Sequence, residues 1–443
     1  MSAAARRVEV ARGPELPAAG ARRAYVRECG RRYWPRGEAA LEALPVPDSA
    51  PPARWPLEYG VVPLPEWAAD LGVEGGLLAP RCCGQRWDDL DWWTAAFLMA
   101  SCFDEHGREA EHGPAHSYSY RLAGVDARVW DRAWVNRIFL FLRRWAARVR
   151  GADEVELFGE LPPAQFVMTH DVDAVAKTPE IRVKQSAMNA MNAVRLMARG
   201  QPGRALEKAG HALRFLLKPG QFDHLRTMRA MERGLGLPTE YNFYGGPGGW
   251  KRTPRLVLLD PAYQVDADAE LQSTIHFLRD DGCTIGLHPS FAAWQNVEML
   301  SQHRARLETA VQRPVTICRQ HWLMFSFEHT WRCQAEAGFT RDSTLGFNDR
   351  SGFRNGAALR LRPWDYRRGA PHVVESLPLV LMDSHIYDYQ PQEASGRVAY
   401  MRRWVDEVRA VRGEATLLWH PHTLSDDYGW KDGFRELIEL LER

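Results

Sequence analysis

From residue 156 onward, short apolar segments alternate with longer amphipathic ones, and this alternation constrains the fold more than any other feature of the chain. Helical patterns at 269–281, 297–312 and 329–337 lie between apolar segments, and another at 397–412 precedes the last one. The alternation predicts a mostly parallel sheet, either open or closed into a (β/α) barrel. The predicted strands are 165–169, 239–243, 284–288, 315–318, 341–345, 373–377 and 415–419.

Polar side chains gather at the ends of these predicted strands, where parallel sheets collect their reactive residues. The strand bodies are apolar, so a structural role alone does not explain the pattern, whereas one shared site does. The residues are His170, Asp171 and Asp173 after the first strand, His288 after the third, Arg319 and His321 after the fourth, Asp342 in the fifth, and His420 and His422 after the last.

The end of the first strand carries the strongest signal. A buried strand loses stability when charges are desolvated, so two acids at its end need a reason. Asp171 and Asp173 are two residues apart and therefore point to the same side of the strand, with His170 on the opposite face. A hard cation or a proton-transfer task is the usual reason for such a pair.

In this order along the chain, the short motifs resemble those of the polysaccharide deacetylase family of the NodB-homology type. The resemblance covers roughly residues 160–440. It implies an α/β fold with a distorted (β/α) barrel. The sequence adds a helical insertion after the first strand and a separate, mainly helical N-terminal domain. The resemblance also implies a metal-dependent hydrolase that removes acetyl groups from N- or O-acetylated sugars, as in cell-envelope or exopolysaccharide biosynthesis.

The resemblance implies a metal site and shows one departure from the family's pattern. THDVD at 169–173 is similar to a first motif in which Asp173 binds the metal. The family's second motif has two histidines four residues apart; His288 matches the first, but Ala292 stands at the second. His321 is the candidate for the missing ligand, because the ends of the third and fourth strands are neighbours. A site of one carboxylate and two imidazoles favours Zn²⁺ as the divalent cofactor.

The resemblance also implies catalytic roles. Asp171 is similar to the catalytic base, which takes a proton from water, and Arg319 to the arginine that orients this base. A nearby arginine would also keep the carboxylate ionised. Asp342 is similar to the fourth-motif acid. His420 is similar to the general acid, and His422, two residues later, is its alternative.

Length, charge and cysteine content constrain the number of domains, the kind of partner and the cellular compartment. A chain of 443 residues is too long for one ordinary domain, so we expect an N-terminal unit of unknown role over 1–155 and the barrel over 156–443. A net charge of +1 gives no argument for a nucleic-acid partner. Without a signal peptide or a membrane-spanning segment, and with seven irregularly spaced cysteines read as reduced thiols, the sequence predicts a cytoplasmic protein.

The insertion, at about 175–235, is helical, rich in methionine and basic. One interpretation is a helical hairpin that covers the barrel mouth with a solvated basic face. The other is a surface that contacts anionic lipid, which would suit a lipid-linked saccharide substrate.

Two other functions stay open. Because Ala292 departs from the family's pattern, the barrel could be inactive and bind glycans or a partner protein. The same hydrolysis at a metal could also act on an amide that is not part of a sugar. Aromatic residues expected near the mouth favour stacking on sugar rings: Trp322, Phe325, Trp364 and Tyr366.

Overall fold

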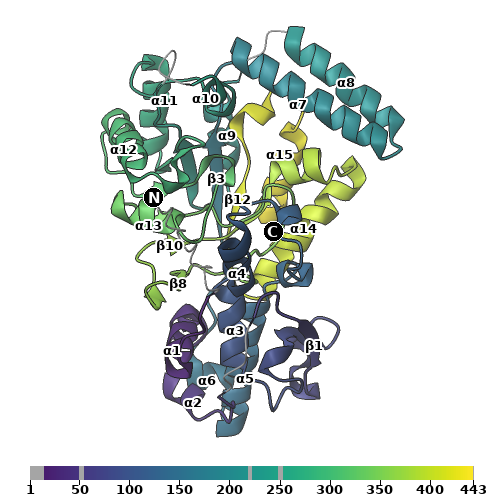
Figure 1. The fold of residues 1–443 in the computed structure, drawn as a ribbon, viewed down its shortest axis with the longest axis vertical. Helices are drawn as coiled ribbons and strands as arrows, with labels where there is room; N and C mark the ends of the chain where they lie inside the picture. Colours follow the sequence, from purple (N-terminus) through teal and green to yellow (C-terminus); the bar gives the residue numbers. More distant parts are fainter. Residues whose placement is uncertain (1–13, 49–53, 218–221, 248–252, 443) are drawn as a thin grey trace, which may run out of the picture.

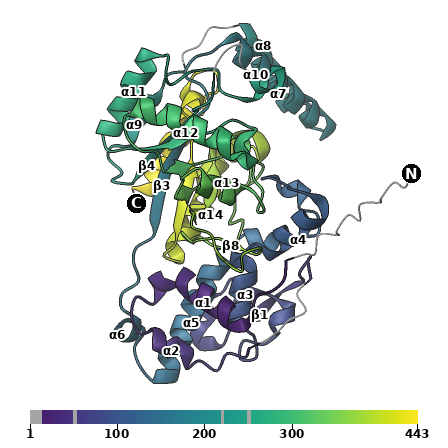
Figure 2. The same ribbon diagram turned by 60° about the vertical axis from the view of Figure 1, so that its left-hand side comes forward.

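A computed structural model describes residues 14–48, 54–217, 222–247 and 253–442. Figures 1 and 2 show a central sheet with helices on both sides and a mainly helical N-terminal segment at one end of the molecule. Helices α11 (Ala269–Asp280), α12 (Val297–Val311) and α13 (Thr330–Glu336) lie on one side of the sheet in Figure 1, and α14 (Ala394–Ala410) and α15 (Lys431–Leu441) lie on the other.

The main sheet has eight strands, and every pairing within it is parallel. This arrangement confirms the expected α/β class. All seven predicted strand segments contribute to the sheet, and one further strand, β11, joins them. In spatial order the strands are β10 (Glu375–Ser376), β7 (Arg341–Asp342), β6 (Ile317–Cys318), β5 (Thr284–Leu287), β4 (Thr239–Phe243), β3 (Gln165–Val172), β12 (Glu414–Leu418) and β11 (Leu379–Met382).

The two ends of this strand order are joined by the chain itself. Strand β10 pairs with β7, and β11, which begins three residues later, pairs with β12. The backbone N–H of Leu379 also donates to the carbonyl of Leu345, beyond the end of β7, at 2.9 Å. The segment 375–382 therefore borders both β7 and β12, so the sheet curls as in a distorted (β/α) barrel.

The helices begin where side chains cap them. Asp268 accepts hydrogen bonds from the first backbone N–H groups of α11, and Asn296 accepts one from Met299 at the start of α12. Thr178 caps α7 (Pro179–Ala198), whose proline at the first position has no N–H to leave unpaired. Helix α7 is followed by α8 (Pro202–Leu217) and α9 (Leu225–Glu232).

Helices α7 and α8 lie side by side and project from the body at the end opposite the N-terminal segment (Figures 1 and 2). A shorter helix, α10 (Pro254–Leu259), precedes α11. None of the described helices is both long and apolar enough to cross a bilayer.

The N-terminal segment contains a two-stranded antiparallel sheet beside its helices. A second small antiparallel pair, β8 (Trp364–Asp365) with β9 (Ala370–Pro371), lies in the barrel half of the sequence. The N-terminal elements are α1 (Ala19–Cys29), α2 (Glu38–Glu42), β1 (Tyr59–Pro63), β2 (Gly76–Pro80), α3 (Trp92–Ala100), α4 (Phe103–His112), α5 (Trp134–Arg150) and α6 (Glu154–Phe158).

This segment is joined to the barrel by a continuous apolar core. Tyr33 donates its hydroxyl proton to the carbonyl of Val411 at 2.6 Å, and Asn136 donates to Ala358 at 3.0 Å. Whether residues 1–155 form a separate domain stays a prediction. All seven cysteine thiols are free, including the adjacent Cys82 and Cys83.

Candidate metal and catalytic site

The carboxyl ends of β3, β5, β6 and β12 bring together most of the polar residues singled out from the sequence. His288 directly follows β5 and Arg319 directly follows β6, and the Arg319 backbone N–H donates to Leu287 at 2.9 Å. Asp171 is the register partner of Asn242 on β4, whose side-chain amide donates to Asp171 Oδ1 at 3.0 Å. Parallel strands thus fix the acids and imidazoles at one edge of the sheet.

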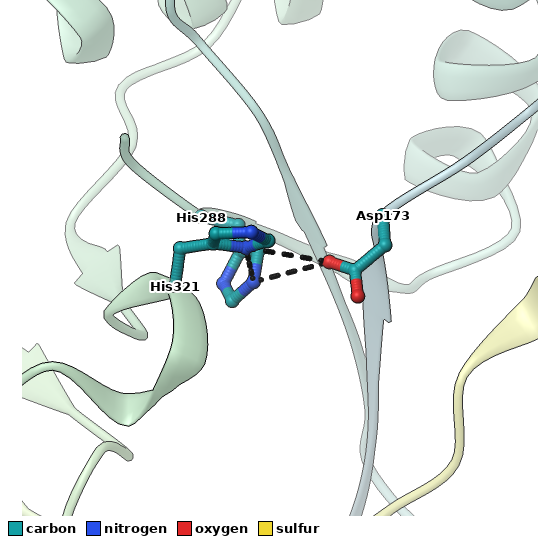
Figure 3. Close-up of side chains that lie close together, drawn as sticks. All are labelled: Asp173, His288 and His321. Carbon is teal, nitrogen blue, oxygen red and sulfur yellow. Dashed lines mark hydrogen bonds and ion pairs between the residues drawn. The ribbon is translucent and has the colours of Figure 1, made fainter. Parts of the chain in front are cut away.

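Asp173, His288 and His321 converge on one point (Figure 3). Asp173 Oδ1 lies 3.3 Å from His288 Nε2 and 3.4 Å from His321 Nδ1. The two ring nitrogens are 2.7 Å apart. Tetrahedral zinc with ligands at about 2.0–2.1 Å would separate its ligand atoms by about 3.3 Å, so a slight opening of the two rings would fit the ion.

The hydrogen bonds of the two imidazoles leave one nitrogen of each ring facing this point. His288 Nδ1 lies 2.8 Å from the carbonyl oxygen of Arg319, and His321 Nε2 lies 2.8 Å from that of Leu259. A carbonyl only accepts, so each of these nitrogens carries a proton, and His288 Nε2 and His321 Nδ1 are the ring nitrogens left to face one another. Two ring nitrogens this close require a shared proton or a cation between them.

The Asp173 carboxylate supplies negative charge at the same point. Its Oδ1 atom is buried and accepts no hydrogen bond. Burial alone would raise the pKa of Asp173, but the neighbouring His321, His288 and His420 hold it well below its usual range, so the group is ionised. A buried, ionised oxygen without a donor fits a bound cation. Among the described residues, this trio is the one group with metal-ligand spacing.

The fourth-strand exit that carries His321 is held in a strained conformation. His321 begins a short 3₁₀ turn, His321–Leu323, in which Trp322 and Leu323 have positive φ angles of 55° and 45°. Such backbone conformations are unfavourable for non-glycine residues and are concentrated at functional sites.

Arg319 lies inside the barrel beside Asp171. Its Nη1 atom is 3.8 Å from Asp171 Oδ1, and the guanidinium is fully buried. Three hydroxyl groups accept its hydrogen bonds: Ser343, Thr169 and Thr416. The arginine therefore places a fixed positive charge next to Asp171.

His420 faces the cluster from the end of β12 and is oriented by Asp383. Its Nδ1 atom lies 2.9 Å from Asp383 Oδ1, and its backbone N–H donates to Asp383 Oδ2 at 2.8 Å. Its Nε2 atom lies 3.7 Å from Asp173 Oδ2. Burial alone would lower the pKa of His420, but Asp383 and the other nearby carboxylates raise it to about 10, which favours the imidazolium.

Asp383 is a residue that the sequence reasoning missed. It is fully buried and directly follows β11. The missed signal was an acid immediately after the apolar run Leu379–Met382, the same pattern that identified Asp171 and Asp173.

The other two catalytic candidates, His422 and Asp342, do not face the cluster as His420 does. The ring of His422 packs against Tyr428 with centroids 5.1 Å apart, although it lines the same pocket. Asp342 is buried in β7, where Trp331 and Gln334 of α13 and Thr344 donate to its two oxygens. The structure does not bring Asp342 to the metal-competent trio.

His170 points away from the cluster, as expected from the alternation of the strand. Its Nε2 atom lies 2.5 Å from Glu232 of α9, and its Nδ1 atom lies 2.7 Å from the carbonyl of Trp419. The second-motif position, Ala292, also lies elsewhere: it lines a separate hollow with Trp294 and Met324. His321, and not residue 292, lies with Asp173 and His288 in the cluster.

The cluster opens into a pocket that α7 walls on one side. Of the aromatic residues predicted at the mouth, Trp322 lines this pocket. The prediction is wrong for the other three, because Phe325, Trp364 and Tyr366 pack in the interior against other rings. Aromatic and amide side chains in the pocket wall are Trp322, Tyr389, Tyr428, Trp430, Gln185, Asn192 and Asn348.

No protein-family model matches the chain, and no curated protein matches it. Among solved structures it is similar to the crystal structure of a "putative polysaccharide deacetylase from Mycobacterium smegmatis", with 14% sequence identity over 63% of this chain and 86% of that one. The TM-score is 0.35, and a likeness of this size carries no argument. Function must therefore be inferred from the site itself.

Proposed function

We propose that the chain is a metal-dependent hydrolase that removes an acetyl group from an N-acetylated or O-acetylated sugar. The observation that carries this proposal is the pair of imidazole nitrogens, His288 Nε2 and His321 Nδ1, facing one another beside the donor-free Asp173 Oδ1. An Asp-His-His set suits Zn²⁺ and leaves coordination positions for other ligands.

The residues around this set supply the remaining parts of a hydrolytic site. A Zn²⁺ ion held there would polarise an acyl carbonyl and acidify a water molecule. Asp171, held by Asn242 and next to the positive charge of Arg319, accepts the proton of the attacking water. His420, kept protonated by Asp383, donates a proton to the departing amine or alkoxide.

A sugar is the proposed substrate because the pocket combines aromatic faces with hydrogen-bonding amides. Trp322 and Tyr389 offer rings on which a pyranose could stack, and Asn192 and Asn348 offer amides to its hydroxyl groups. The proton-transfer and metal-binding groups line the same pocket, so an acetyl substituent could reach them from a sugar ring held against these side chains.

The metal site is tested by titrating chelator-treated protein with Zn²⁺ in a calorimeter. We expect a single equivalent to bind, and His321→Ala to weaken binding by at least about 100-fold, because a ligand is lost. His112→Ala is the matched control, since that imidazole lies on the surface at the end of α4. An unchanged Kd in His321→Ala would overturn the ligand assignment.

The reaction is tested separately by acetate release from N-acetylhexosamine oligomers. Asp171→Asn keeps the size of the side chain and is expected to slow release by at least about 100-fold while zinc still binds. Equal rates would remove Asp171 from the role of base. Stoichiometric zinc and glycan binding without acetate release by the unmodified protein would favour the glycan-binding alternative.

A further inference from the structure

Helices α7 and α8 carry most of the exposed large apolar side chains of the described chain, and all of these but Met191, which lines the pocket, lie outside the pocket wall. Thirteen such residues are exposed in total, and eight of them lie on these two helices. Leu206, Leu213 and Leu217 are 60–69% exposed and share one face of α8 by their helical spacing. A contiguous exposed apolar surface on a folded protein marks a site of association.

Helix α7 separates this surface from the pocket. Residues at positions 181, 185, 188, 192 and 195 line the pocket, and their spacing of four and three residues places them on one face. Val183, Val194 and Met197 are 52–70% exposed and lie on the opposite face. The outer apolar face is therefore about one helix diameter, roughly 10 Å, from the pocket wall.

The inner side of the hairpin is fixed to the body. Lys208 of α8 pairs with Asp388 at 2.9 Å, and Phe215 packs against Phe222 and Tyr428. These contacts leave the outer side as the face that can meet a partner.

The hairpin is also strongly basic. Residues 179–217 contain seven arginines and lysines and two glutamates, a net charge of +5, whereas the whole chain has +1. Arg199, directly after α7, and Arg214 of α8 are exposed beside the apolar residues. Apolar side chains flanked by arginines suit the boundary between anionic headgroups and acyl chains.

We propose that the α7–α8 hairpin docks the protein on an anionic membrane surface, with its outer apolar face in the headgroup region. The positive charge complements anionic lipid, and none of the exposed residues needs to span the bilayer. Docking would hold the pocket close to the headgroups, which suits a saccharide tethered to a lipid. That last consequence rests on the proposed function, whereas the docking itself does not.

The test is co-sedimentation of the full chain with vesicles. We expect binding to equal parts of phosphatidylglycerol and phosphatidylcholine, weaker binding at high salt, and little binding to phosphatidylcholine alone. The double variant Leu206→Glu/Leu213→Glu should lower partitioning by about 100-fold, roughly tenfold per lost apolar contact.

The matched control is Val149→Glu/Val155→Glu, which adds the same charge at exposed valines of α5 and α6 and should bind as the unmodified protein does. No binding to anionic vesicles, or equal binding by the hairpin variant, would overturn the proposal. Elution of the unmodified chain as a dimer and of the hairpin variant as a monomer, with neither bound to vesicles, would overturn it in favour of self-association. Zinc titration of the hairpin variant separates a failure here from a failure of the proposed hydrolase site.

Discussion

At the scale of single residues, the protonation of His420 depends on the neighbouring carboxylate of Asp383. Asp383 receives hydrogen bonds from both the ring and the backbone of His420. Burial raises and the histidine lowers the pKa of Asp383, with a net lowering that keeps it ionised. Asp383 is thus a positioning residue that fixes the ring tautomer and stabilises the imidazolium.

Replacing this carboxylate by an amide tests that role. Asp383→Asn keeps the shape but removes the charge and presents an N–H group to the ring. We expect kcat for acetate release to fall by about 10²–10⁴-fold, with KM, zinc affinity and the melting temperature nearly unchanged. A merely structural role would instead lower the melting temperature, and an unchanged kcat would contradict the assignment.

The sequence predicted the metal-competent trio because each of its members follows an apolar strand. Asp173 and His288 also matched motif positions of the family that the sequence resembles. His321 was inferred because the ends of the third and fourth predicted strands are neighbours. Asp342 did not join the cluster, because its side chain turns towards Trp331 and Gln334 on a helix whose packing no local pattern reveals. The direction of a side chain at a strand end depends on such tertiary contacts.

At the scale of elements, the strands were predictable because most of them contain short apolar runs that end in polar residues and alternate with amphipathic helices. The segment 239–243 coincides with β4, and 269–281 differs from α11 by one residue. Strand β11 was missed because only Leu377 and Pro378 separate it from β10, so a single strand was expected in this stretch. The curl that lets this stretch border both β7 and β12 is set by long-range pairing.

The close approach of β4 and β5 makes Gly286 a sensitive position. A Cβ atom there would lie 2.1 Å from Asn242 Oδ1, and Asn242 is the donor to Asp171. We expect Gly286→Ala to cost about 1–3 kcal/mol of unfolding free energy and to slow acetate release, because Asn242 must move. Gly20→Ala on α1, with open space around it, is the control. If Gly286→Ala kept the wild-type stability and rate, Asn242 could shift without affecting either, and the prediction would be wrong.

At the scale of the whole molecule, the N-terminal segment and the barrel share buried charge as well as an apolar core. Glu105 of α4 pairs with Arg354 at 2.7 Å, and both side chains are buried. Arg354 also donates to Ser117 and to the carbonyl of Gly346. One guanidinium therefore ties α4 and the chain after it to the barrel.

Glu105→Ala would leave the Arg354 charge buried without its carboxylate, and we expect the unfolding free energy to fall by about 3–5 kcal/mol. Because the core is continuous, far-ultraviolet circular dichroism and tryptophan fluorescence should report one shared transition, shifted to lower temperature. Asp88→Ala breaks the exposed pair with Arg86 and should leave the transition temperature nearly unchanged. Two separate transitions, with only one of them moved by Glu105→Ala, would instead support the independent N-terminal domain predicted from the sequence.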